Sequence, residues 1–427
     1  MKIHPCAALL AGLVAVAAPA AESARPITGV DRAYMNLSAS PCKDFYAYAC
    51  GAFDQVPIPG EYSAYGVNQE IDERNFAVLK DILETSAKNG GVKGSVAQRV
   101  GDFYASGMDE PTIERAGLKP LAPWLAEIAA IKSPADIVTT LGHMQAEGLD
   151  AGFSFGVQID DKDTTAMIAA FAQGGLGLPE RDYYFRTGPE AEDTRQAYVA
   201  HVARMLELAG DQPAAAQPAA AAVMALETRI AKVSRTLVER RDPEKNYNKF
   251  ARTALTKLTG DFDWESFLAQ VSFPPSEKNV LVGQPEFFTG FGTLLVSEPV
   301  AAWQSYLRWQ LLNQTANYLG HAFVDEHFAF FGKKLSGATE LRPRWKRVMA
   351  AADQAVGEDI GQLYVQRMFS PAAKARVLEM VKFHLQAVHD RIAAAPWMSA
   401  ETKQQAYKKI AKMRSKIGYP DKWRDYS

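Results

Sequence analysis

Apolar residues recur every three or four positions over much of the chain, which is the period of an amphipathic α-helix. Ser133-Pro134 and Ser370-Pro371 each supply an N-cap residue followed by proline at the first helical position, and Ser297-Glu298-Pro299 opens a third segment. The stripes that follow are Ile137, Leu141 and Met144; Val300, Trp303, Leu307, Leu311 and Tyr318; and Val377, Met380, Val381, Leu385, Val388 and Ile392. Residues 401–416 repeat the pattern through Ala406, Ile410 and Met413. We expect these stripes to be core faces of a mainly α-helical protein.

The alternation typical of strands is scarce. Residues 153–159 alternate apolar with small or polar side chains, and the acidic stretch 160–163 predicts a turn. A second strand near 167–172 would complete a small β-hairpin, and 280–282 could form one more short strand. The Ala/Pro-rich stretch 212–222 predicts an exposed loop that leads into a helix at 224–241.

The N-terminus has the pattern of a secretory signal peptide. Lys2 precedes an apolar run from Ala7 to Ala18, and Ala18-Pro19-Ala20 provides a cleavage site after Ala20. The run is too short to span a bilayer and ends in proline. The sequence therefore predicts an exported protein, periplasmic or extracellular, that loses Cys6 with its signal.

The size and charge of the chain limit the domain organisation and the kinds of partner that we expect. The chain has 427 residues, more than one core usually supports, so we expect two lobes. Of these residues 48% are apolar and 22% charged, with a formal net charge of −2. This balance gives no electrostatic reason to expect a nucleic-acid or membrane partner.

Cys42 and Cys50 are the two cysteines that survive export. The residues between them, 44–49, have no helix breaker and precede Gly51, which predicts a short helix with a glycine stop. A helix of eight residues advances about 12 Å, whereas a disulfide joins Cα atoms roughly 4.4–6.8 Å apart. The two thiols either have partners outside this chain or are buried free cysteines that act as small apolar residues.

No catalytic pattern stands out. A zinc helix of the common peptidase kind needs two histidines one turn apart with a glutamate beside the first. His321 and His327 are six residues apart, and His384 and His389 lie about 140° apart around a helix. We therefore expect His327 to be a packed or surface histidine. The glycine-rich stretch 174–179 lacks the lysine of a phosphate loop and favours a turn or gate.

Several segments, taken together, resemble the neprilysin family of zinc metallopeptidases, the M13 peptidases. They are Cys42-Lys43-Asp44-Phe45-Tyr46-Ala47-Tyr48-Ala49-Cys50-Gly51, Gly175-Leu176-Gly177-Leu178-Pro179-Glu180-Arg181-Asp182-Tyr183-Tyr184, Val356-Gly357-Glu358 with Leu363-Tyr364-Val365, and Lys416-Ile417-Gly418-Tyr419-Pro420-Asp421-Lys422-Trp423. The resemblance implies a large multi-helix lobe with a small β-hairpin, corresponding to the N-terminal part of a two-lobed peptidase. Together with the signal-peptide pattern, it divides the chain into a signal peptide (1–20), an exposed segment (21–40) and a peptidase N-terminal domain (41–427).

The resemblance also implies where the chemistry lies. In the family, the zinc ligands and the catalytic glutamate belong to a later, C-terminal half, so no catalytic or metal residue is carried onto this sequence. Zinc is then the cofactor of the intact enzyme and peptides are its substrates. Cys42 and Cys50 match positions that bond to cysteines of the C-terminal half, and Ala64 and Gln69 match the wall of the substrate chamber.

At two positions this sequence departs from the family pattern, which limits the family properties that can be carried over to it. Some members have a cysteine where this chain has Gly107, so one disulfide is absent here. Mammalian members have an arginine that holds a substrate carboxylate where this chain has Ala64, which favours an endopeptidase.

Three hypotheses follow for function. The chain is the N-terminal portion of a secreted zinc endopeptidase, inactive alone because its zinc-binding half is missing. Alternatively, it is a non-catalytic helical peptide-binding module derived from such an enzyme. In the third, a separately encoded C-terminal fragment docks onto it and restores activity.

Overall fold

The computed structural model of the chain describes residues 30–260 and 262–427, so the expected signal peptide and residues 21–29 of the expected exposed segment lie outside the described residues. The chain divides into two compact units. The first contains the residues up to Pro59 together with Tyr65–Asn75, and the second contains Gly60–Ala64 together with Phe76–Ser427.

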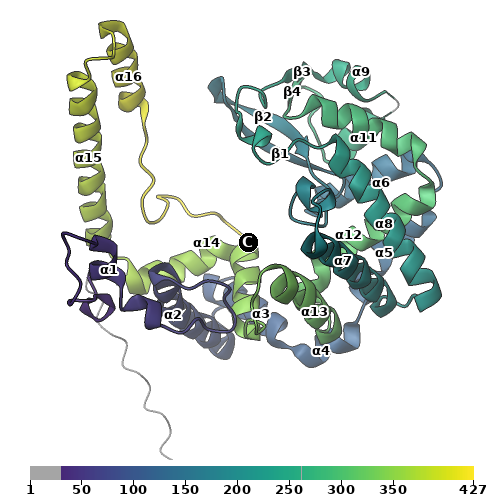
Figure 1. Cartoon of the computed structure of the whole chain (residues 1–427), viewed down its shortest axis with the longest axis horizontal. Coiled ribbons are helices and arrows are strands. Elements are labelled where there is room, and N and C mark those ends of the chain that lie inside the picture. The colour runs from purple at the N-terminus through teal and green to yellow at the C-terminus, as the bar shows by residue number, and fades with distance from the viewer. Residues whose placement is uncertain (1–29, 261) are drawn as a thin grey trace, which may run out of the picture. The chain divides into compact units, whose positions relative to one another are not determined.

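The described residues form sixteen α-helices and four β-strands, so the protein is mainly α-helical, as predicted (Figure 1). The helices are α1 (Phe45–Cys50), α2 (Val67–Asn89), α3 (Val96–Met108), α4 (Glu110–Ala116), α5 (Ala122–Ala130), α6 (Pro134–Ala146), α7 (Pro189–Leu208), α8 (Pro213–Val233), α9 (Leu255–Thr259), α10 (Trp264–Gln270), α11 (Pro285–Ser297), α12 (Val300–Thr315), α13 (His321–His327), α14 (Arg344–Met368), α15 (Pro371–Ala394) and α16 (Ala400–Lys412). The strands are β1 (Phe153–Asp160), β2 (Asp163–Gln173), β3 (Lys249–Ala251) and β4 (Asn279–Val282). Short 3₁₀ turns connect many of them, including η4 (Arg181–Tyr184) and η7 (Ala316–Tyr318), and a π-helical segment, η8 (Phe328–Leu335), continues α13.

The first unit contains the short helix predicted between the two cysteines. Asp44 caps α1, since its Oδ1 accepts a hydrogen bond of 2.9 Å from the amide of Ala47. Gly51 closes the helix by donating its amide hydrogen to the Ala47 carbonyl. The helix begins only at Phe45, so Cys42 precedes it in a turn instead of lying on the same helix as Cys50.

The small sheet of the second unit has the order β1-β2-β4-β3. The expected hairpin is confirmed, because β1 and β2 pair antiparallel and turn between Asp160 and Asp163. The short strand expected at 280–282 is also confirmed as β4, which runs parallel to β2 and antiparallel to β3. The alternation along β1 does not make one buried face over its whole length: Phe153 is buried, but Val157 and Ile159 are more than half exposed.

The larger hydrophobic core packs helices against this sheet. Aromatic residues dominate where sheet and helices meet, and Phe153 of β1 contacts Phe267 of α10 and Phe288 and Phe291 of α11 at ring-centroid distances of 5.1–5.6 Å. The stripe of α6 is fully buried, and its start is fixed by the predicted cap: Ser133 and Asp136 form a capping box. In α12 Val300 is partly buried and Trp303, Leu307 and Leu311 are fully buried, but Tyr318 falls beyond the helix end in η7 and is 56% exposed.

A second, smaller core joins the C-terminal part of α2 to α3 and α14. Its buried residues include Leu83 of α2, Val100 and Tyr104 of α3, and Val348 and Ala352 of α14. The side chain of Ser95 caps α3 by accepting from the amide of Gln98.

Two sequence predictions about helices are corrected. The Ala/Pro-rich stretch is part of α8, which runs from Pro213 to Val233 and ends before 241. Pro213 occupies the first turn, where its missing N–H costs nothing, and Pro218 lies inside the helix. The small Ala216 and Ala220 side chains are fully buried, so this stretch is a tightly packed helix face rather than a loop.

The stripes of α15 and α16 are not core faces. Ser370 and Ser399 cap the two helices as expected, but neither helix contains a buried residue. Met380 and Phe383 of α15 are 62% and 65% exposed, and Met413 is 56% exposed just past the end of α16. The apolar side chains of this helical hairpin therefore remain accessible.

Candidate functional site

The described residues do not offer a zinc site. Within 30–260 and 262–427, no group of three or more His, Cys, Asp or Glu side chains could hold a metal ion. His201 comes nearest to one: its Nδ1 lies 2.7 Å from Glu326 Oε1, and its buried Nε2 has no hydrogen-bond partner within the described chain. However, the ring stacks on Phe330, and the one neighbouring imidazole, His327, lies 6.4 Å away between ring centroids. Burial and the charge of His201 lower the pKa of His327 to about 4.

The two cysteine thiols are both free. Cys42 is exposed in the turn before α1, and Cys50 is partly exposed at the end of that helix. Cys42 and Cys50 are not the two ends of one continuous helix, because Asp44 between them is extended (φ −147°, ψ 94°), so a helical rise does not give their separation.

The residues expected on a chamber wall are each accessible to solvent. Ala64 is exposed and belongs to the second unit, whereas Gln69 is partly buried in the first turn of α2 and belongs to the first. Gly107 lies near the end of α3 and faces Val348 of α14: a Cβ atom added at Gly107 would lie 2.5 Å from Val348 Cγ1. Glycine at 107 therefore lets the two helices approach closely.

The glycine-rich stretch 174–184 turns around a buried carboxylate. Glu227 of α8 is fully buried, and its Oε2 accepts hydrogen bonds of 2.8 Å from both Tyr184 Oη and Tyr198 Oη. A Cβ at Gly177 would lie 1.9 Å from Tyr198 Oη, so only glycine fits there. Gly175 has φ +77°, a left-handed conformation that glycine adopts readily. The turn interpretation of this stretch thus has a concrete structural basis.

Burial controls the protonation of Glu227. Desolvation raises its pKa from 4.5 to about 7, although hydrogen bonds from Tyr198 and Tyr184 favour the ionised form. The carboxylate is held by α7, α8, α12 and η4, because Gln310 of α12 also donates to it at 3.3 Å. It has no outlet to solvent, so we assign it a structural role.

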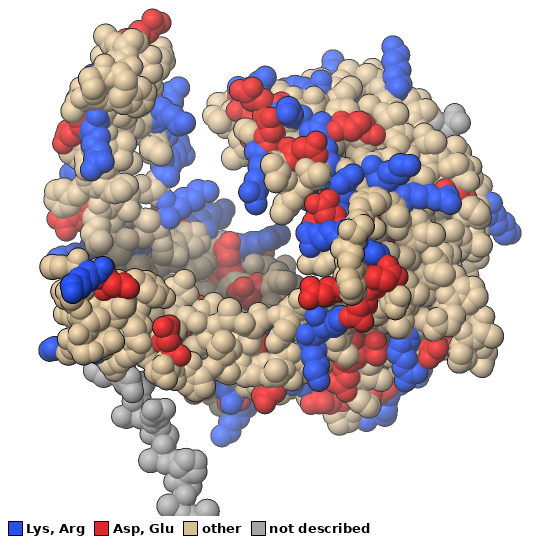
Figure 2. All heavy atoms as spheres, viewed as in Figure 1, with Lys and Arg blue, Asp and Glu red and all other residues tan. Residues whose placement is uncertain are grey.

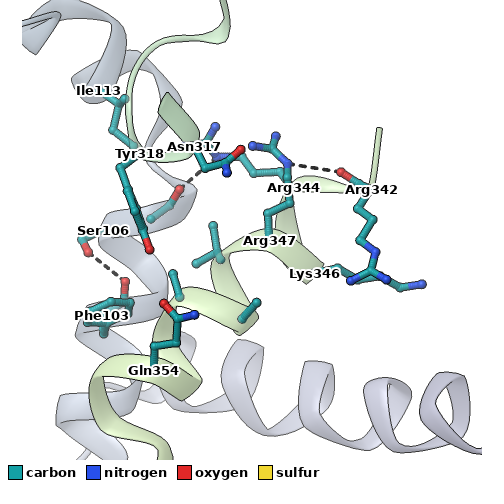
Figure 3. A pocket seen from close by; sticks show the side chains of 14 residues that line it. Phe103, Ser106, Ile113, Asn317, Tyr318, Arg342, Arg344, Lys346, Arg347 and Gln354 are labelled. Atoms are coloured by element: carbon teal, nitrogen blue, oxygen red, sulfur yellow. Dashed lines mark hydrogen bonds between the residues drawn. The ribbon is translucent and has the colours of Figure 1, made fainter. Parts of the chain in front are cut away.

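A cavity of about 430 Å³ opens beside the start of α14; we call it the α14 pocket (Figure 3). One part of its lining is apolar or aromatic, from Phe103 of α3, Ile113 of α4 and Tyr318 of η7. The other part is cationic, from Arg342, Arg344, Lys346 and Arg347. Figure 3 places Tyr318 on one side of the pocket and the cationic side chains on the other.

The cations of the α14 pocket are only partly neutralised. Glu61 Oε1 lies 2.6 Å from Lys346 Nζ, and Glu61 Oε2 lies 3.9 Å from Arg342 Nε. Arg344 Nε donates to the Gly107 carbonyl at 2.9 Å and lies 3.7 Å from Glu110 Oε1. Arg347 donates through Nε to the Arg342 carbonyl at 3.2 Å and forms no ion pair with a described residue.

The electrostatics of Arg347 reflect this imbalance. Burial lowers the pKa of Arg347 below its usual value and the charge of Arg344 lowers it further, while the carboxylates of Glu110 and Asp325 partly oppose this shift. The start of α14 adds to the positive field, since the N-cap residue, Pro343, provides no side-chain hydrogen bond to the first-turn amides. This local excess of positive charge contrasts with the face shown in Figure 2, where Lys and Arg alternate with Asp and Glu.

Sequence reasoning missed both Glu227 and the α14 pocket. Glu227 follows an Ala-rich stretch and carries no motif of its own. The run Arg342-Pro343-Arg344-Trp345-Lys346-Arg347 is a visible cationic signal, but its pocket depends on helices that begin more than 200 residues earlier.

No helix among the described residues is both long enough and apolar enough to cross a membrane.

Known proteins resemble this chain in sequence and in fold. The N-terminal sequence model of Peptidase family M13 matches residues 41–420. Endothelin-converting enzyme 1 of Rattus norvegicus is 26% identical over 405 residues, which cover 91% of this chain and 52% of that protein. Endothelin-converting enzyme-like 1 of Mus musculus is 28% identical over 406 residues, with 91% and 52% covered. The chain thus spans about half the length of the curated relatives it matches.

Solved structures agree with these relatives. The zinc metalloprotease Zmp1 of Mycobacterium tuberculosis, in complex with an inhibitor, superposes with a TM-score of 0.87 at 33% identity, over 93% of this chain and 60% of that one. PepO from Lactobacillus rhamnosis has the same fold, with a TM-score of 0.80 at 21% identity over 90% of this chain and 60% of its own. On the family match along residues 41–420, this chain belongs to Peptidase family M13.

Proposed function

We propose that this chain is the N-terminal, non-catalytic portion of an exported zinc metalloendopeptidase that cleaves peptides. In the intact enzyme a C-terminal half would hold zinc, which would supply polarisation of the scissile carbonyl, and a glutamate of that half would activate water as a general base. The residues of this chain shape and line the substrate chamber.

The family match carries this proposal. The sequence aligns over nine-tenths of its own length with only half of endothelin-converting enzyme 1.

Exposed surfaces support a missing partner. Apolar residues of the α15–α16 hairpin, including Met380 and Phe383, are accessible, as is the thiol of Cys42. We propose that the C-terminal half covers the hairpin and bonds to Cys42 and Cys50. Export to the periplasm or cell exterior provides the oxidising conditions that such disulfides need.

An endopeptidase is favoured over an enzyme that trims terminal dipeptides. Ala64 offers no charge to hold the terminal carboxylate of a substrate at that position. Among peptides of equal sequence, the intact enzyme should cleave amidated and free-acid forms at similar rates. A clear preference for the free acid near the cleavage site contradicts this assignment.

A non-catalytic peptide-binding module is the second candidate. The α14 pocket favours it, because residues of this chain alone form a cavity of ligand size.

Nucleotide sequencing distinguishes the two candidates. If the chain is the N-terminal portion of a zinc peptidase, the codons that follow Ser427, read in all three frames, should encode a helix with the pattern His-Glu-x-x-His. The polypeptide encoded there, mixed with this chain, should restore chelator-sensitive peptide cleavage. If no such helix occurs over several hundred codons, the binding-module function is preferred.

A further inference from the structure

The α14 pocket has the size and lining of a ligand site. Its volume of about 430 Å³ falls in the range of small-ligand pockets, which combine apolar walls with a few convergent polar groups. Here Phe103, Ile113 and Tyr318 form the apolar wall and the start of α14 provides the polar one.

The charge of the polar wall defines the ligand class. Glu61 and Glu110 lie within 4 Å of cations that line the pocket, and neither carboxylate lines it. Arg347 forms no ion pair with a described residue, although Glu110 and Asp325 act on it from a greater distance, so its charge remains available to an anionic ligand. An anion that enters the pocket would relieve the repulsion between Arg344 and Arg347.

The geometry of Arg347 favours a planar anion with two acceptor oxygens, such as a carboxylate. Its Nε donates to the Arg342 carbonyl, which fixes one edge of the guanidinium group. Neither terminal nitrogen donates to a described residue, so that both remain available to a carboxylate. Lys346 is less available, since Glu61 holds its ammonium group and the ring of Phe76 lies 5.4 Å from it.

We propose that the α14 pocket binds a carboxylate carried by a peptide, with Arg347 as its principal ligand and an adjacent apolar side chain of the peptide against Phe103, Ile113 and Tyr318. The carboxylate comes either from an acidic side chain or from the peptide C-terminus. The choice of a peptide rests on the proposed function; the anion preference rests on the pocket alone.

Binding of short peptides to the purified chain tests this inference. The probes are three acetylated tripeptides: Leu-Glu-Phe amide, Leu-Gln-Phe amide and Leu-Gln-Phe free acid. We expect the first, the third or both to bind at least about tenfold more tightly than the neutral amide, and to weaken with added salt. Binding of the first alone identifies a side-chain carboxylate, and binding of the third alone identifies a terminal one.

Three variants locate the site. Arg347→Gln should weaken binding of the charged peptide about tenfold, and Ala351→Phe should block the pocket while retaining its four cations. Arg204→Gln, on the exposed face of α7, is the matched control and should bind as the unaltered chain does. If Arg347→Gln fails to fold, Ala351→Phe and the more exposed Arg342→Gln decide the question.

Equal affinity for all three peptides, or charged-peptide binding that Arg347→Gln and Ala351→Phe leave unchanged, overturns the inference. If the chain binds inorganic phosphate but none of the three peptides, the assignment of a peptide ligand is overturned. Because these measurements need neither zinc nor cleavage, their failure is distinguishable from failure of the proposed function.

Discussion

The carboxylate of Glu227 on α8 accepts a 2.8 Å hydrogen bond from Tyr184 at the end of η4. This bond holds the turn of residues 175–184 against α7, α8 and α12, because Tyr184 Oη also accepts from the amide of Leu178 at 3.1 Å. The most recognisable internal segment of the sequence is therefore anchored on a residue that has no motif of its own.

Glu227 should make stability depend on pH. Its pKa rises from 4.5 when unfolded to about 7 when folded, so the folded state binds more protons between those values. Stability should be greatest below about pH 4.5 for this group and fall by roughly 3 kcal/mol as pH rises through 7. The measurement is urea unfolding of wild type and Glu227→Gln over this range, and the difference between them should carry that dependence. A difference that is constant with pH contradicts the account.

Tyr184→Phe should destabilise the protein more at about pH 8 than at about pH 5, because a hydrogen bond to an ionised carboxylate is stronger than one to a neutral group. We expect a loss of roughly 1–3 kcal/mol at the higher pH. Urea denaturation at both pH values checks this, and an equal loss at both would argue that Glu227 does not change charge there.

Gly107 and Val348 should accept an engineered disulfide. A Cβ at Gly107 would lie 3.4 Å from Val348 Cβ, close to the separation of about 3.5–4.5 Å in natural disulfides. Gly107→Cys with Val348→Cys should oxidise spontaneously and stabilise the chain by about 2–4 kcal/mol. Melting with and without reductant measures the gain. The single variants serve as controls, and an absence of cross-linking indicates that α3 and α14 do not approach as described.

The exposed apolar residues of α15 should affect association rather than stability. Met380→Ser with Phe383→Ser should change the free energy of unfolding by less than about 0.5 kcal/mol, because both side chains are mostly exposed. The same change should reduce self-association seen by light scattering. By contrast, Trp303→Ala in the core should cost about 3–5 kcal/mol. A large loss of stability on the α15 substitutions would mean that the hairpin packs against this chain.

Both thiols of the first unit should be available for intermolecular bonds. In exported, purified protein we expect iodoacetamide to modify Cys42 and Cys50, and Cys42→Ser with Cys50→Ser to abolish any disulfide-linked dimer. Mass spectrometry of tryptic peptides checks this. A bridge between Cys42 and Cys50 themselves would remove the reason to place their partners on another polypeptide.

Local signals predicted much of the fold. Ser133 and Ser370 marked helix starts that the structure confirms, and the alternation at 153–159 located β1. Those features depend on hydrogen bonds and contacts between near neighbours in sequence, which short patterns record.

The errors arise where tertiary packing decides. Alanines of 212–222 suggested a loop, but Ala216 and Ala220 are small enough to pack fully within the core, so the segment is helical. The apolar stripe of α15 has the spacing of a core face, but α15 contains no buried residue. The spacing of apolar residues predicts a helix with an apolar face and does not tell what packs against that face. Likewise, the α14 pocket forms only when η7, α3 and α14 come together.

Zinc content, measured together with peptide cleavage, tests the central claim most directly. The account predicts that the purified chain, dialysed with excess zinc, retains less than about 0.1 equivalent of metal and cleaves no peptide. Retention of about one zinc per chain, with cleavage that a chelator abolishes, would contradict it.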